Sequence, residues 1–276
     1  MKNKTIGIFY LILLVILIFI ARHILINEKL PIKKELTFEE EIQKIPYYKD
    51  ENLKRYQNYK KQNKNFSNNE IVTYVNIGLD NPYYTNIKPS PRQYTKEILV
   101  NKYNYISSTY IPNNLQMINT KYSNNGMYLT TEAKEAFERL AEAAEKDQYT
   151  ITVMSAYRTY EYQQSLYNRY LAIDGQELTD TYSARAGHSE HQTGLAVDVY
   201  NKSKPYTEFE KTQEFYWMKE NSYKYGYILR YPKDKEFITG YQYEPWHYRY
   251  VGVEIATYLY KNNLTYDEYF IRNLEQ

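Results

Sequence analysis

The sequence predicts an α+β domain in which helices pack against an antiparallel sheet. Residues 132–146 place apolar side chains at helical spacing, and residues 149–155 then alternate as a half-buried strand does. The segments that follow mix further helices and strands, but they lack the regular strand–helix–strand repetition of a parallel sheet. The 276 residues suffice for one domain of ordinary size preceded by an appendage.

The appendage begins with an apolar segment that predicts a transmembrane helix at residues 1–26. Ile6 to Ala21 carries no charge, and three further apolar residues lie just beyond Arg22. A helix across the hydrocarbon core needs ~20 apolar residues, and an arginine at its end can reach the interface. Lys2 and Lys4 precede the segment, and no small-residue cleavage site follows it, so an uncleaved anchor is favoured over a signal peptide. We therefore expect a single-pass protein of the cell membrane whose remaining residues are extracytoplasmic.

Residues 27–69 predict a polar stalk between this anchor and the domain. They are rich in Lys, Glu, Asn and Gln and poor in aliphatic residues, a composition typical of a solvated and partly helical segment. The apolar pattern resumes at Glu70 to Val75. We therefore assign residues 70–276 to the globular domain.

The first half of the domain predicts a helix, a strand and a second helix. Thr131 is a suitable N-cap for a helix from Glu132 to Lys146. A strand follows from Tyr149 to Ser155, and Glu161 to Leu171 predicts the next helix. The apolar face of the first helix consists of Ala133, Ala136, Phe137, Leu140, Ala141 and Ala144.

The second half predicts three strands and two helices. Residues 195–200 alternate as a strand, residues 209–221 are helical, and residues 226–231 and 240–250 predict two more strands. A helix at residues 253–261 closes the domain. Thr265 and Glu268 then form a capping box that starts a terminal turn or helix.

Composition excludes several classes of site. The chain has no cysteine, so disulfides, thiolate zinc sites and a cysteine nucleophile are ruled out, and any metal must be held by His, Asp or Glu. A net charge of +2 gives no indication of a nucleic-acid partner. The 36 tyrosines are interpreted mainly as a composition bias, and stacking of a few of them on sugars stays open.

One chemical signal lies in the segment Ser189 to Asp198. His191 lies in a Ser- and Gly-containing loop that enters a strand, and Asp198 is a charged residue within that otherwise apolar strand. A buried aspartate is costly unless it is paired. Either a metal ion or a buried arginine would satisfy it.

A second signal is the segment Glu244 to His247. Together with His191 and Asp198, His247 completes a three-ligand set of the kind that binds Zn²⁺ and leaves one position for water. Glu244 is then placed to take a proton from that water. Residues three apart in an extended strand face opposite ways, so the chain must turn or bulge here. His188 is a competing ligand, but a fourth protein ligand would close the site to water.

These two segments carry a family resemblance. The pattern Ser-x-His-x-x-Gly-x-Ala-x-Asp at Ser189 to Asp198, followed by Glu-x-Trp-His at Glu244 to His247, resembles the zinc D-Ala-D-Ala carboxypeptidases of the VanY type. The likeness covers the chain from about Ile71 to Tyr260. Further similar segments are Val100–Asn104, Gly126–Tyr128, Ser155–Arg158, Tyr162–Ser165, Gly187–Ser189, Tyr225–Gly226, Leu229–Pro232 and Gly240–Glu244.

The resemblance implies a role for each candidate residue and a fold. The implied zinc ligands are His191, Asp198 and His247; the implied catalytic base is Glu244; Arg158 is implied to steady the developing charge on the scissile carbonyl; and Gln163, Ser189 and Trp246 are implied to line the substrate peptide. The implied fold is the α+β fold shared with the hedgehog signalling domain. The implied activity is removal of the terminal D-alanine from peptidoglycan stem peptides.

Several alternatives remain open at this point. The pocket beyond the metal could suit an LD-carboxypeptidase acting on tetrapeptides, or an endopeptidase that cuts a cross-bridge. The domain could also be a non-catalytic zinc-binding module, although an intact Glu244 and Arg158 argue against that. A structural wall-binding protein with incidental histidines would bind no metal. The sequence does not indicate the oligomeric state.

Overall fold

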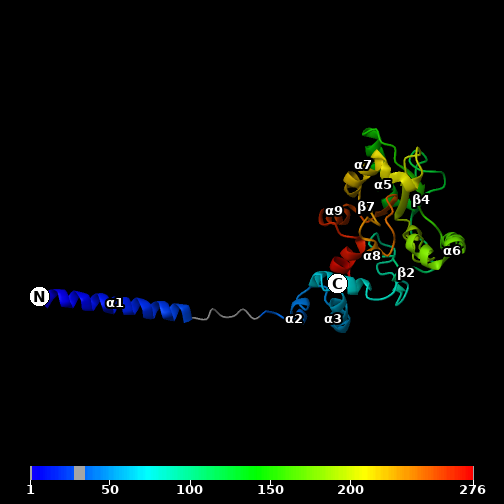
Figure 1. Cartoon of the computed structure of the whole chain (residues 1–276). Coiled ribbons are helices and arrows are strands. Elements are labelled where there is room, and N and C mark those ends of the chain that lie inside the picture. The colour runs from blue at the N-terminus through cyan, green and yellow to red at the C-terminus, as the bar shows by residue number, and fades with distance from the viewer. Residues whose placement is uncertain (1, 28–34, 276) are drawn as a thin grey trace. The chain divides into compact units, whose positions relative to one another are not determined.

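The computed structural model describes residues 2–27 and 35–275, which form two compact units, Met1–Glu41 and Ile42–Gln276 (Figure 1). The first unit contains helix α1 (Lys2–Asn27), and α2 (Phe38–Ile42) ends at the boundary between the units. The second unit contains the remaining elements and all the candidate site residues. Each unit is described here by itself.

Helix α1 covers the segment predicted to be a membrane anchor, and this prediction is wrong. Within residues 2–27 and 35–275, no helix combines the length and the apolar character that crossing a membrane requires. The prediction counted apolar residues on both sides of Arg22 as one span. The charge-free run from Ile6 to Ala21 is by itself shorter than the ~20 residues that the hydrocarbon core demands. Membrane association through this helix is not shown.

The second unit begins at Ile42 and therefore includes residues that the sequence assigned to a stalk. Helices α3 (Leu53–Gln62) and α4 (Asn68–Ile77) pack together, with Tyr56 fully buried. The Tyr56 hydroxyl donates a hydrogen bond to Asn76 Oδ1 at 2.6 Å. The polar composition of α3 concealed this contact, because Tyr56 is the one fully buried residue in a helix whose other side chains are half-buried or exposed.

The remaining elements of the second unit follow in chain order. They are β1 (Lys88–Pro89), β2 (Asn104–Tyr105), β3 (Leu115–Met117), β4 (Tyr128–Thr130), α5 (Thr131–Lys146), β5 (Thr152–Ser155), α6 (Tyr160–Tyr182), the 3₁₀ turn η2 (Glu190–Thr193), β6 (Ala196–Tyr200), η3 (Tyr206–Lys211), α7 (Gln213–Asn221), η4 (Ser222–Tyr225), β7 (Tyr227–Leu229), α8 (Glu236–Thr239), β8 (His247–Tyr250), α9 (Val253–Asn262), α10 (Tyr266–Tyr269) and the closing turn η5 (Phe270–Leu274).

A four-stranded antiparallel sheet carries the site. Its strand order is β5-β6-β8-β7, and every neighbouring pair is antiparallel. The register places Asp198 of β6 directly opposite His247 of β8 and also opposite Ser155 of β5. The predicted α+β class with an antiparallel sheet is therefore confirmed.

The main core lies on one face of this sheet. Helix α5 buries all six of its predicted apolar residues there, against Val197 and Val199 of β6. Because side chains alternate along a strand, Asp198 must point to the opposite face. The same alternation that builds the core thus delivers the aspartate to the other side of the sheet.

Some predicted element boundaries differ from the structure. Helix α5 begins at Thr131 itself, whose hydroxyl donates to the Asn114 carbonyl instead of capping the helix. Helix α6 runs on to Tyr182, with a break at Gly175, where φ is 73°. The predicted strand at 240–250 forms only as β8. The capping box of Thr265 and Glu268 is confirmed, and it starts α10.

Candidate active site

A short turn fixes the position and the tautomer of His191. The residue lies in η2, which ends at Gly194 in the left-handed conformation with φ 67°. Its Nδ1 lies 2.7 Å from the backbone carbonyl oxygen of Ala156. That carbonyl can only accept, so Nδ1 carries the proton, and the lone pair of Nε2 faces Asp198 Oδ2 at 3.3 Å.

A turn before β8 brings Glu244 and His247 to the same point. The His247 amide donates to the Glu244 carbonyl at 3.1 Å, which closes the turn, and the strand starts only at His247. His247 Nδ1 consequently lies 3.6 Å from Glu244 Oε2 and 3.2 Å from Asp198 Oδ1. The turn that the spacing required is present.

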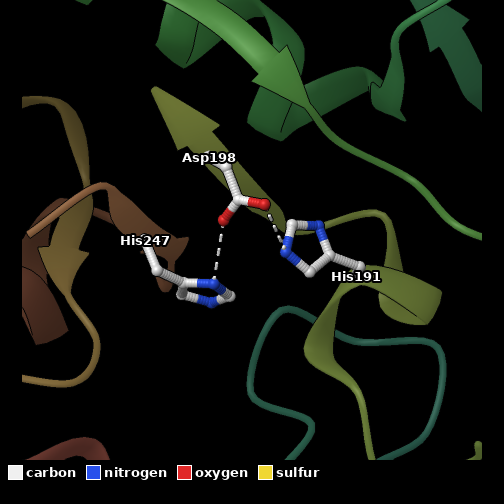
Figure 2. Close-up of side chains that lie close together, drawn as sticks. All are labelled: His191, Asp198 and His247. Carbon is white, nitrogen blue, oxygen red and sulfur yellow. Dashed lines mark ion pairs between the residues drawn. The ribbon is translucent and has the colours of Figure 1, made fainter. Parts of the chain in front are cut away.

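The three candidate ligands form a compact group. Figure 2 shows the imidazoles of His191 and His247 directed at the carboxylate of Asp198 from two sides. Their donor atoms all lie within 4.8 Å of one another, and all three residues are buried. Asp198 Oδ1 has no hydrogen-bond partner among the described residues. Two imidazoles and a carboxylate are donors that Zn²⁺ accepts, so these residues fit a three-ligand metal site.

The alternative ligand His188 lies outside this group. Its Nδ1 is 2.8 Å from the Asn101 carbonyl oxygen, and its ring packs edge-on against Tyr84. Burial lowers the pKa of His188, so the ring is held neutral. Its contacts are those of a packed side chain.

The electrostatics of the group favour a cation. Burial by itself would raise the pKa of Asp198, but His191 and Arg158 outweigh it and hold that pKa well below its usual range. Burial, helped by Arg158, lowers the pKa of His191 to about 4, which leaves the ring neutral as a metal ligand must be. Burial opposes a charge on His247, yet the neighbouring carboxylates of Asp198 and Glu190 raise its pKa to about 9. The carboxylates around His247 therefore attract positive charge to this point.

Glu244 differs from the other carboxylates in its protonation. Burial raises the pKa of its carboxyl to about 8, although His247 acts in the opposite direction. A carboxyl whose pKa lies near neutrality can both accept and return a proton at physiological pH. This is the property that a general acid–base residue requires.

Arg158 contacts the ligand group directly. Its Nη2 donates to Asp198 Oδ2 at 2.5 Å, and its Nε donates to Ser155 Oγ at 2.9 Å. The arginine thus holds Asp198 ionised while it also lines the cleft above the site. The Arg158 side chain is about one-fifth exposed, so it remains accessible from the cleft.

A cleft of about 1060 Å³ opens over the ligand group. The predicted substrate-lining residues Gln163, Ser189 and Trp246 all lie in its wall. Gln163 is buried and donates to the Ala184 carbonyl at 2.7 Å, and Trp246 packs edge-on against Tyr206. Further aromatic residues of the wall are Tyr128, Tyr157, Tyr162, Tyr170, Tyr182, Tyr231 and Tyr241.

Comparison with known proteins settles the family. The model of the VanY family, D-alanyl-D-alanine carboxypeptidase, matches residues 126–253. The bifunctional D-Ala-D-Ala dipeptidase and D-Ala-D-Ala carboxypeptidase VanXYC of Enterococcus gallinarum is 35% identical over 178 residues, which are 62% of this chain and 91% of that protein. The chain belongs to the VanY family. It therefore carries a peptidase domain, of the hydrolase class.

Solved structures of the VanY family and its relatives share the fold. The LD-carboxypeptidase LdcB has a TM-score of 0.64 and 35% identity, and the match covers 68% of this chain and 91% of LdcB. A mutant of the vancomycin resistance D,D-pentapeptidase VanY in complex with Zn(II) has a TM-score of 0.55 and 36% identity, covering 63% of this chain and 98% of that one. The chain spans 66% or less of the length of three other curated relatives that it matches.

Three charged residues next to the VanY-type site escaped the sequence reasoning. Glu190, Arg230 and Arg249 are buried together, and both arginines contact the glutamate. Burial would raise the pKa of Glu190, but the two guanidiniums hold it well below its usual range. A signal was present: each arginine stands in a segment of aromatic and apolar residues, as Asp198 does. Glu190 occupies the unspecified position of the Ser-x-His pattern, so the motif gave no reason to single it out.

Proposed function

We propose that the chain is a zinc-dependent D-alanyl-D-alanine carboxypeptidase that removes the terminal D-alanine from peptidoglycan stem peptides. One observation carries the proposal: His191, Asp198 and His247 converge beneath a large cleft, with Glu244 beside them. Membership in the VanY family and a related VanY structure in complex with Zn(II) support it. A wall peptide as substrate would place the domain on the cell-wall side.

The chain's own residues have separate tasks in this proposal. His191, Asp198 and His247 would hold the Zn²⁺, which when bound supplies a Lewis acid for the scissile carbonyl and the attacking water. Glu244 accepts a proton from that water and returns it to the leaving amine. Arg158, anchored on Asp198 and Ser155, offers positive charge at the site where the carbonyl oxygen becomes negative.

The cleft accounts for peptide binding. The cleft is lined by Gln163, Ser189 and Trp246 and by several tyrosines, whose side chains provide both apolar faces and hydroxyl groups. Such a wall suits a short peptide of small side chains and repeated amide groups. The last residue of the substrate, which the enzyme must recognise and release, would then lie next to Arg158 and Glu244.

A second candidate is an LD-carboxypeptidase that acts on tetrapeptide stems. The specific observation in its favour is the likeness to LdcB, an LD-carboxypeptidase. The two activities share the proposed metal chemistry and differ in the stereochemistry of the residue before the cleaved bond. Substrate comparison separates them.

The test uses the full-length protein loaded with zinc. D-alanine release is measured from pentapeptide and from tetrapeptide stems, with zinc content measured in parallel. The Glu244→Gln variant should keep its zinc and lose about 10²–10⁴-fold in kcat, the contribution typical of a general base. The exposed Glu142→Gln variant serves as the control and should match the parent.

Three results would contradict the proposal. Full turnover by Glu244→Gln would remove the assigned base. A parent protein that binds no zinc would remove the metal site. Release from tetrapeptides alone would replace the DD activity by the LD activity.

A further inference from the structure

The two oxygens of the Glu190 carboxylate have different neighbours. Its Oε1 accepts hydrogen bonds from Arg230 Nε and from Arg249 Nη1, each at 2.8 Å. All three side chains are buried. Because one oxygen takes both guanidiniums, the other oxygen is left for a different partner.

That second oxygen faces His247. Glu190 Oε2 lies 3.6 Å from His247 Nε2, and neither atom has a hydrogen-bond partner within the described part of the chain. The opposite nitrogen, Nδ1, faces Asp198 and Glu244. Nε2 of His247 therefore faces Glu190, whereas Nδ1 faces Asp198 and Glu244.

The carboxylate cannot easily turn away from this position. Arg230 Nη1 donates to Asp267 Oδ2 at 2.6 Å, and Asp267 Oδ1 accepts from Asn101 at 2.8 Å. Arg249 Nη2 donates to the carbonyls of Ile98 and Lys96 at 2.8 and 3.0 Å. The network joins α10, β8 and the loop before β2, so Glu190 is held from several sides.

We propose that Glu190 is a positioning residue for His247, and this inference rests on the proposed metal role of that histidine. The carboxylate accepts the proton of Nε2, which leaves the lone pair of Nδ1 directed at Asp198 and free to bind a metal. Carboxylates that accept from the second nitrogen of a metal-binding histidine fix its tautomer and orientation. A merely structural role, neutralisation of two buried arginines, would not require Oε2 to face the ring.

The Glu190→Gln variant separates these roles. Its amide oxygen can still accept from the two arginines, and its NH₂ group would then face His247 Nε2. A donor at that point favours the tautomer in which Nδ1 carries the proton, the wrong one for metal binding. The matched control is Asp267→Asn, which removes one charge from the same buried network without touching His247.

Zinc affinity and thermal stability are measured on the full-length parent and both variants, the affinity by competition with a chelator. Glu190→Gln should bind zinc about 10–100-fold more weakly, the usual effect of losing such a partner. Asp267→Asn should lower the melting temperature of the zinc-free protein and keep the parent's zinc affinity. Equal zinc affinity of Glu190→Gln and parent would overturn the inference but leave the proposed function intact. A parent that binds no zinc would overturn both.

A second measurement decides the matter if Glu190→Gln does not fold. The ¹⁵N chemical shifts of His247 in the zinc-free parent report its tautomer at alkaline pH, once a pH titration shows that the ring is neutral. A proton on Nε2 supports the inference. A proton on Nδ1 overturns it.

Discussion

At the scale of single residues, three buried carboxylates next to His247 have different neighbours and therefore different charges. Asp198 is held ionised by Arg158, and Glu190 by two arginines. Among the described residues, the only ion pair of the Glu244 carboxylate is with His247, at 3.6 Å, and burial raises the pKa of this carboxyl to about 8. Environments that push pKa values apart are the usual sign of separate acid–base roles. This separation supports the proposed role of Glu244 in proton transfer.

The pKa of Glu244 predicts a pH-dependent stability for the zinc-free protein. The folded state holds this proton more tightly than the unfolded chain, whose carboxyl has the ordinary pKa of 4.5. The contribution of Glu244 to stability is therefore fully present below pH 4.5 and is lost as the pH rises through about 8. Glu244→Gln carries a neutral amide that does not titrate.

Thermal unfolding in the presence of a chelator checks this prediction. The melting temperature of the parent should fall relative to that of Glu244→Gln as the pH is raised from 4.5 to 8. If the difference in melting temperature between the parent and Glu244→Gln stays constant across this pH range, Glu244 is not held protonated in the folded protein.

The candidate residues could be found from the sequence because each is a polar group in an unfavourable setting. Asp198 in an apolar strand and Glu244 in an aromatic segment both require a partner. The same reasoning did not extend to Arg230 and Arg249, whose partner Glu190 lies 40 or more positions away. Pairings over such separations depend on the sheet register, which the pattern of one strand does not contain.

At the scale of the elements, the sheet register is what assembles the site. Asp198 and His247 are direct partners on β6 and β8, so a single antiparallel pair supplies two of the three candidate ligands. The alternation along β6 was predictable, and with it the side of the sheet on which Asp198 lies. A turn between Glu244 and His247 was expected from their spacing, but the residue at which β8 starts was not, because the segment contains no glycine and its only local signal is Pro245.

A glycine next to this sheet predicts a measurable packing constraint. Gly226 ends η4 with φ 83°, and a Cβ there would lie 2.7 Å from the Tyr250 ring and 2.9 Å from the backbone of Gly252. Gly126 has a similar φ of 77°, but a Cβ would meet nothing within 4 Å. Alanine costs about 1–2 kcal/mol of backbone strain at either position. Only Gly226→Ala adds a clash, of about 1–3 kcal/mol.

Denaturant unfolding of the two variants tests this difference. Gly226→Ala should be less stable than Gly126→Ala by the cost of the clash, and Tyr250 links this cost to β8, which carries His247. Equal losses of stability would mean that β7 and β8 adjust without cost, and the sheet would then be a less rigid support for the site than the packing indicates.

At the scale of the whole molecule, the compact unit that carries the candidate site begins at Ile42, within the segment that the sequence assigned to a stalk. A cluster of buried side chains, Tyr74, Ile77, Tyr103, Ile238 and Ile271, is covered by partly buried Tyr47, Tyr59 and Phe66. These covering aromatic rings come from residues before the predicted boundary at 70. Composition averaged over the segment concealed them, since only a few positions in it are buried.

Two truncations follow from this arrangement. A protein of residues 42–276 retains the whole compact unit and should match the full chain in melting temperature and in D-alanine release. A protein of residues 70–276 loses Tyr56 and the covering rings, and it leaves Arg55's partner Asp80 unpaired. Each buried aromatic is worth about 1.5–3 kcal/mol, and 1 kcal/mol shifts Tm by about 2–4 °C at this size, so Tm should fall by about 10 °C or more. Equal melting of the two truncated proteins would instead support the boundary at residue 70.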